Sequence, residues 1–354
     1  MTLPAAASRV EPRHAHASVG WGARWLGAAA MRSRVAPIVL ALLVAAATAA
    51  PIVAPHAPST TFPSLLNAPP TRIHLRDASG AWHAPFIHPW TRVNQLEQIY
   101  EEDRATRVPL AWLSGGHLVT TADPRRAPLL LAGADGLGRD VFSRLVFGAR
   151  VSLGLAAVAA AGALLAGVLV GGLAGYAGGA AEDVLMRLTD VVLVLPTIYL
   201  VMALRSALPL ALSPLVVFAL LAALFALVGT PVIARGVRGV VRGEARQDYT
   251  LAAVSLGATP WRVLWRHLLP AARGLVFVEG LMLVPSFIVA EATLTYVGFG
   301  FPDEVPTWGT MLHDASNIRA LADFPWLLAP AVAMFAVVYA INATFHRPRT
   351  SLLS

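Results

Sequence analysis

Residues 244–270 read EARQDYTLAAVSLGATPWRVLWRHLLP, and this stretch decides how the rest of the chain is interpreted. It predicts two short helices. The first covers about 248–256 and ends at Gly257, because Gly is the usual residue just beyond a helix end, where the backbone turns left-handed. The second begins at Thr259-Pro260, an N-cap followed by Pro in the first turn, and stops at Leu269-Pro270. Two helices joined by so tight a turn form a compact projection, too small to be a domain.

The second helix carries Trp261 and Trp265 four residues apart, with an Arg beside each. Two interpretations fit this pattern. The projection could dock onto another protein, or it could be an amphipathic helix that lies on a membrane surface with a basic face. These features alone favour neither interpretation.

The composition indicates a membrane protein. The 354 residues are 56% hydrophobic and 13% charged, whereas a soluble domain carries roughly 25% charged residues, and the mean hydropathy is +0.64. The absence of Cys excludes a disulfide framework, a Cys metal site and a thiol nucleophile. Every basic residue is Arg; without Lys the chain has no P-loop, so another subunit must bind any ATP that is used.

Six segments are candidates for membrane spans, since a helix needs about 20 mainly apolar residues to cross roughly 30 Å of hydrocarbon. The first could be a cleaved signal peptide, because Ala46–Ala50 resembles a cleavage site, but its length and Pro51 favour retention. The six are about 35–53, 151–176, 184–204, 212–234, 275–297 and 324–345.

The distribution of Arg predicts the orientation, because cytoplasmic segments carry an excess of positive charge. Five Arg precede the first span against Glu11, and seven lie in 235–273 against Glu244 and Asp248. The segment between the last two spans is mainly acidic. Both termini are therefore expected in the cytoplasm, with residues 54–138 and 300–322 on the outer side.

Residues 54–138 are rich in Pro, Trp and His, and they form the only sizeable stretch outside the predicted spans. They could be a small extracytoplasmic subdomain or an irregular cap on the membrane part. A short charged helix is expected near 94–106. The five His in this stretch match no metal-binding spacing, so no metal site is expected.

The 244–270 stretch resembles the EAA loop of ATP-binding-cassette importer permeases, the binding-protein-dependent transport inner-membrane family. That pattern is Glu-Ala-Ala, three residues, Gly, nine residues, Ile, any residue, Leu-Pro. The chain keeps this spacing with Leu251 in place of Glu and His267 in place of Ile, as is usual in the dipeptide/oligopeptide group. By this resemblance the coupling residues that contact the ATPase are Tyr249, Ala252, Ala253, Gly257, His267, Leu269 and Pro270.

Two further stretches are similar to the same group. Residues 134–153 resemble its Gly-Thr-Asp-x-x-Gly-Arg-Asp signature, and residues 291–312 resemble its Glu-Ala-x-Leu-Ser-Phe-Leu-Gly-Leu-Gly and Pro-Ser-Trp-Gly-x-Met-Leu segments. The outer-face signature residues are Gly138, Arg139, Asp140, Trp308 and Gly309. From the residues themselves, Asp140 is expected to cap a helix, with Arg139, Arg144 and Arg150 at the level of the lipid headgroups.

The resemblance implies an all-α integral membrane protein with six transmembrane helices, the type I importer permease fold, and a cytoplasmic coupling helix. It implies a sister permease, two cytoplasmic ATPase subunits that bind the ATP, and an extracytoplasmic solute-binding protein. The membrane is of the bacterial inner, or plasma, type. The chain itself would hold no cofactor or metal, bind no nucleic acid and catalyse no reaction. The implied divisions are a cytoplasmic tail (1–34), a first span (35–53), an extracytoplasmic segment (54–138), a permease core (139–345, with the EAA-type loop at about 235–270) and a cytoplasmic tail (346–354).

Glu279 lies well inside the fifth predicted span, where an ionisable group usually faces a cavity or a partner. It could line a wet translocation path, or it could form an internal structural pair; Glu291, nearer the end of the span, could simply be interfacial. Several Gly in 162–175 predict close packing of the second span, although Gly is also generally frequent in membrane helices. An ion-coupled secondary transporter or channel remains the alternative function. An intramembrane enzyme would need clustered catalytic residues, which the sequence lacks.

Overall fold

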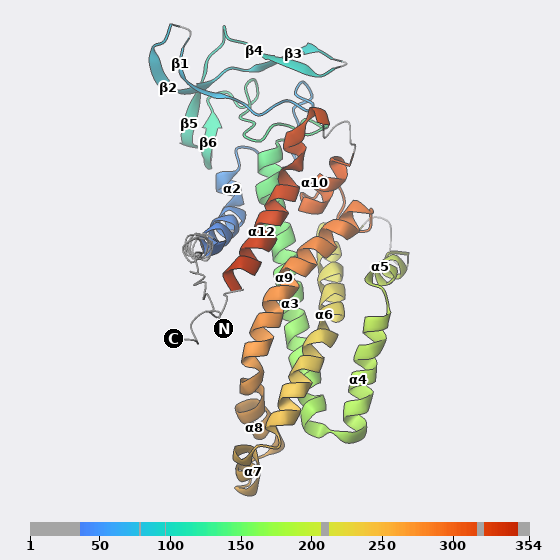
Figure 1. Cartoon of the computed structure of the whole chain (residues 1–354). Coiled ribbons are helices and arrows are strands. Elements are labelled where there is room, and N and C mark those ends of the chain that lie inside the picture. Colours follow the sequence, from blue (N-terminus) through green and yellow to red (C-terminus); the bar gives the residue numbers. More distant parts are fainter. Residues whose placement is uncertain (1–35, 78, 96, 207–211, 317–321, 346–354) are drawn as a thin grey trace, which may run out of the picture.

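The computed structural model describes residues 36–345, except 78, 96, 207–211 and 317–321. Long helices form a bundle, with the β-strands gathered at one end and two short helices at the other (Figure 1). We call these the strand end and the knob end. The expected all-α fold is therefore correct for the bundle but wrong for the segment before it.

Among the described residues, four helices are long and apolar enough to cross a membrane. They are α3 (Val141–Ala177), α6 (Pro214–Glu244), the continuous run Pro260–Tyr296 that ends in α9 (Leu269–Tyr296), and Pro325–Thr344, which contains most of α12 (Ala329–Phe345). The helix Ala36–Thr48 is apolar but shorter, and α2 (Ala50–Val53) follows it. The chain is thus a multi-pass membrane protein in which a count of six spans stays a prediction.

The third predicted span is not one straight helix. It consists of α4 (Gly179–Val194) and α5 (Thr197–Ser206), and the pair is bent by 85°. The bend lies at Leu195, which has an extended backbone. Pro196 follows it, and Pro disfavours the helical conformation of the residue before it. If the pair is counted as one broken span, the described residues contain up to five.

The helix expected to stop at Leu269-Pro270 instead continues into the next span. Short α8 (Pro260–Val263) leads into a π-helical turn, Leu264–Leu268, and from there into α9. Pro270 comes just after the wider π turn, which interrupts the α-helical hydrogen-bond pattern at the place where Pro would otherwise break it, so the run continues past this Pro. The expected stop was therefore wrong, because α8, the π turn and α9 form one continuous helical run.

The glycines of α3 pack against α6, which confirms the prediction of a close-packed face. A Cβ added to Gly171 would lie 2.3 Å from the carbonyl oxygen of Ala234, and one added to Gly175 would lie 2.8 Å from that of Arg238. A Cβ added to Gly167 would lie 2.4 Å from the Cβ of Ile233. These small residues, four apart, let the two backbones approach as spanning helices do in lipid.

The strands form a folded β-subdomain, so the alternative of an irregular cap was wrong. Four antiparallel strands pair in the order β1 (Ile73–Arg76), β2 (Trp82–Ile87), β5 (Val108–Ser114) and β6 (His117–Thr121). A second pair, β3 (Trp90–Asn94) and β4 (Ile99–Glu102), occupies the place of the helix expected near 94–106. Aromatic and β-branched residues favour strands, and Arg92 pairs directly with Tyr100.

Candidate functional site

The projection at the knob end consists of α7 (Asp248–Ser255), a turn at Gly257 and α8. We call residues 248–263 the knob. Gly257 has φ +83°, and a Cβ added there would meet no atom within 4 Å. The backbone conformation, not crowding, therefore requires Gly, as the sequence predicted. The Thr259 side chain accepts from the backbone N–H of Arg262, which confirms the predicted N-cap.

The free side of α7 is apolar and unusually exposed. Leu251, Val254 and Leu256 expose 53%, 50% and 89% of their surface. Ala252 is exposed and Ala253 is half-buried, so small side chains leave the helix backbone accessible beside these larger ones. Such a surface on a short helix is suited to burial against another molecule.

The base of the knob is fixed to the bundle. Val263, Leu264 and Leu268 are buried in one cluster with Ile233 and Val237 of α6. His267 and Leu269 are half-buried at this base and Pro270 is exposed. The base of the knob therefore packs on α6 and continues into α9.

Tyr249 contacts residues that flank the knob on both sides in the sequence. Its hydroxyl donates a hydrogen bond to the Glu244 carboxylate, and this bond raises the pKa of Tyr249. Its ring lies 6.4 Å from the ring of His267, centroid to centroid. Trp261 and Trp265 remain exposed, with ring centroids 5.3 Å apart, so the geometry also accommodates the membrane-surface interpretation.

At the strand end, the predicted signature residues enter α3 through a tight turn. Gly138 has φ +73°, and a Cβ there would lie 2.3 Å from the carbonyl oxygen of Phe62. Asp140 caps α3 by accepting from the backbone N–H groups of Phe142 and Ser143, which confirms the predicted cap. Burial raises the pKa of Asp140 to about 6, in spite of these hydrogen bonds.

Arg139 and Arg144 were expected at the level of the lipid headgroups, but neither side chain is exposed there. Both are buried, with 6% and 1% of their surface exposed. Arg139 Nε lies 2.6 Å from Asp135 Oδ2 and its Nη2 lies 2.7 Å from Asp314 Oδ2; Arg144 reaches the same carboxylates at 3.8 and 3.6 Å. The correction has a physical reason: two carboxylates from separate segments neutralise the arginines inside the protein. Arg150 is exposed.

Asp135 and Asp314 were not singled out from the sequence, although both lie in or beside the two signature stretches. The sequence signal that could have indicated them is the presence of acidic and basic residues in two segments that flank apolar helices. Asp135 lies in the turn before α3, and Asp314 ends α10 (Trp308–Asp314). The four-residue charge cluster, Asp135, Arg139, Arg144 and Asp314, therefore joins the two signature stretches.

Trp308 and Gly309 pack α10 against α3 and α9. Trp308 is 1% exposed, its indole N–H donates to the Leu145 carbonyl at 3.2 Å, and its backbone N–H donates to Ser152 Oγ at 3.2 Å. A Cβ on Gly309 would lie 2.7 Å from Thr295 Cβ. The structure thus brings all five predicted signature residues to the strand end.

Glu291, which the sequence allowed to be simply interfacial, is buried inside the protein. It is 1% exposed and accepts hydrogen bonds from Ser152 and Thr295, each at 2.9 Å. Since Ser152 also accepts from Trp308, Glu291 orders the contact between α3, α9 and α10. A buried carboxyl group is tolerated when such donors surround it.

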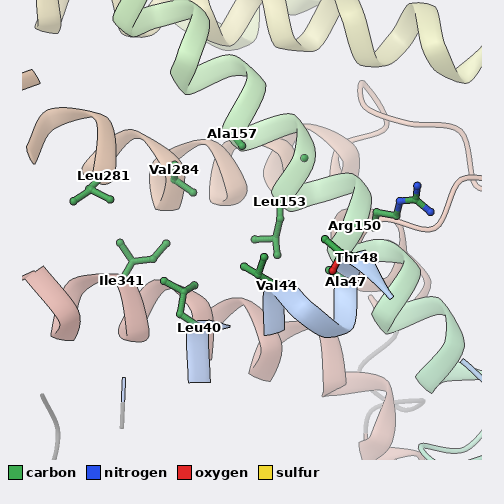
Figure 2. A pocket seen from close by; sticks show the side chains of 11 residues that line it. Leu40, Val44, Ala47, Thr48, Arg150, Leu153, Ala157, Leu281, Val284 and Ile341 are labelled. Atoms are coloured by element: carbon green, nitrogen blue, oxygen red, sulfur yellow. The ribbon is translucent and has the colours of Figure 1, made fainter. Parts of the chain in front are cut away.

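Glu279 is half-buried in α9. No hydrogen bond or ion pair joins it to another residue in the described part of the chain, so the structural-pair interpretation finds no partner there. It is also absent from the apolar cavity of about 430 Å³ that opens beside α3 (Figure 2). That cavity is lined by Leu40, Val44, Ala47, Thr48, Arg150, Leu153, Gly154, Ala157, Leu281, Val284 and Ile341.

Comparison with known proteins gives a consistent result. Residues 167–347 match the family model described as binding-protein-dependent transport system inner membrane component. The chain is 36% identical over 221 residues to the oligopeptide transport system permease protein OppC of Bacillus subtilis, covering 62% of this chain and 70% of that one. It is 34% identical over 210 residues to the dipeptide transport system permease protein DppC of the same organism (59% and 64%). It is 33% identical over 210 residues to the glutathione transport system permease protein GsiD of Pectobacterium atrosepticum (59% and 67%).

Proposed function

The chain belongs to the family of inner membrane components of binding-protein-dependent transport systems, and from this premise we propose that it carries peptides or similar small polar solutes. It is a permease subunit of an ATP-binding-cassette importer, not an enzyme. The names of the relatives, which specify oligopeptides, dipeptides and glutathione, support this solute class.

The importer complex that we propose contains a sister permease, two cytoplasmic ATPase subunits and an extracytoplasmic solute-binding protein. ATP is bound by the ATPase subunits, and this chain holds no cofactor. Its own contribution is six spans with both termini in the cytoplasm, which places the knob end in the cytoplasm and the β-subdomain outside. The excess of Arg in 235–273 supports this orientation.

The observation that carries the proposal is the knob. Its apolar α7 surface projects from the knob end of the bundle, and its base is fused to α6 and α9. A displacement of α7 by an ATPase is therefore passed directly to two spanning helices. Alternating access follows when ATP closes the ATPase pair, the knob moves with it, and the helices reorient the path.

Two further proposed roles do not involve the knob. Glu279 lines the solute path, and the signature residues Gly138, Arg139, Asp140, Trp308 and Gly309 hold the strand end in one arrangement.

Transport by reconstituted vesicles tests the proposal. Proteoliposomes that hold this chain, its sister permease and both ATPases should accumulate a labelled tripeptide when the binding protein is outside and ATP is inside. Vesicles without the ATPases serve as the control. Equal accumulation in the control, driven by an ion gradient, would contradict the proposal and favour a secondary transporter.

A further inference from the structure

The β5–β6 hairpin ends in an exposed apolar tip. Trp112, Leu113 and Leu118 expose 60%, 78% and 44% of their surface, and Gly115 and Gly116 form the turn between the strands. Residues 108–121, VPLAWLSGGHLVTT, include no Asp, Glu or Arg. Exposed apolar patches of this kind mark sites that contact a protein or a membrane.

Leu113 is unfavourable at its position for two independent reasons. Its φ is +51°, a left-handed conformation that L residues other than Gly, Asn and Asp adopt at a cost. Its side chain is also 78% exposed, so packing within the chain offsets little of the strain. Strained residues of this kind mark places where the surroundings supply the compensation.

The hairpin tip is hydrogen-bonded to the end of an apolar helix. The Nδ1–H of His117 donates to the carbonyl oxygen of Ala54 at 2.7 Å. Ala54 directly follows α2, which continues the apolar helix that begins at Ala36. Figure 1 shows the β5–β6 hairpin reaching toward α2, whereas β3 and β4 lie at the far side of the β-subdomain. The tip is therefore held at the end of this apolar helix, which belongs to the first predicted span.

We propose that the tip of the β5–β6 hairpin inserts into the interfacial region of the leaflet at the strand end, with Trp112 among the headgroups and Leu113 and Leu118 against the acyl chains. Trp is enriched at this depth because its ring is amphipathic, and leucines beside it bury their surface in the acyl boundary. This anchor fixes the β-subdomain relative to the membrane. The inference depends on the membrane-spanning helices and not on the solute.

The absence of Cys from the chain makes the depth of the tip measurable. Leu113→Cys and Leu118→Cys are each labelled with an environment-sensitive fluorophore in the full complex, in nanodiscs of phosphatidylethanolamine and phosphatidylglycerol. Val93→Cys is the matched control, because Val93 is 60% exposed on β3. Nitroxide-labelled lipids are then added at the headgroup or the upper acyl chain.

We expect nitroxide lipids to quench the labels at positions 113 and 118 at least twofold more than the label at 93. Quenching at 113 and 118 no greater than at 93 overturns the proposal. A label that lipid does not quench but that the solute-binding protein protects from an aqueous quencher also overturns it, in favour of a protein-docking surface. Because two tip positions are labelled separately, poor assembly of one variant leaves the other to decide.

Discussion

Arg139 and Asp314 are 175 positions apart in the sequence, yet Nη2 of the first lies 2.7 Å from Oδ2 of the second. The contact joins the turn before α3 to the end of α10, and α10 in turn packs on α9. At the strand end of the bundle, charge pairing as well as apolar packing therefore holds α3 and α10 together.

Removing one member of this pair should destabilise the protein strongly. In Arg139→Gln the carboxylates of Asp135 and Asp314 lose their closest cation, and breaking a buried pair in this way costs about 3–5 kcal/mol. The measurement is thermal unfolding of the detergent-purified complex. Arg126→Gln is the control, since Arg126 pairs with Asp123 at 3.8 Å on an exposed surface and should change the midpoint little. Equal midpoints for the two variants would contradict a structural role of the cluster.

Stability should fall with rising pH through the titration of Asp140. Burial raises the pKa of Asp140 from 3.8 to about 6. The folded state therefore binds the proton more tightly than the unfolded state, so this contribution is full below pH 4 and is lost between about pH 4 and 6. A shift of this size is worth up to about 3 kcal/mol.

Asp140→Asn tests this, because Asn caps a helix about as well as Asp and does not titrate. Unfolding midpoints of both proteins are compared from pH 4 to 7. The wild-type midpoint should fall relative to that of the variant across the lower part of this range. Parallel curves would show that Asp140 titrates at its ordinary pKa.

Substitutions in the knob distinguish docking of the knob onto an ATPase subunit from its binding to the membrane surface. Ala253→Glu and Gly257→Asp should leave the chain inserted but release the ATPase subunits and reduce ATP-dependent uptake at least tenfold. The first places a charge on the α7 surface, and the second forces a Cβ into a left-handed turn at a cost of roughly 1 kcal/mol. Co-purification of the ATPases with each variant is the measurement.

Trp261→Ala and Trp265→Ala are the matched comparison. A membrane-surface helix predicts that losing these exposed rings is more harmful than enlarging Ala253 or Gly257. Full ATPase retention and full uptake in both Ala253→Glu and Gly257→Asp would exclude the docking assignment.

Glu279→Leu should reduce uptake per complex while the yield of assembled complex stays near that of the wild type. The reason is that no described side chain pairs with Glu279, so its loss leaves no buried charge behind. Yield and uptake are measured on the same preparations. Glu291→Leu provides the contrast. It leaves the buried hydroxyls of Ser152 and Thr295 without their acceptor, so it should lower the yield of assembled complex before it lowers uptake per complex. Normal uptake in Glu279→Leu would remove this residue from the path.

The sequence by itself determined the features that local chemistry controls. Runs of apolar residues located the four helices that are long and apolar enough to cross a membrane. The Gly257 turn, the Thr259 cap and the Asp140 cap each follow from the preference of one residue for one backbone conformation. The small residues of α3 also predicted a packed face, although the sequence did not say that α6 is its partner.

Only the tertiary structure decided the features that depend on distant partners. Arg139 is buried because Asp314 reaches it, and Glu291 is buried because Ser152 and Trp308 meet there. Residues 94–106 carry charges at spacings that also suit a helix, and pairing of Arg92 with Tyr100 decides for strands. The physical reason is common to all three: a charge or a strand is stabilised by a partner whose position is set by the whole fold, and no local propensity contains that information.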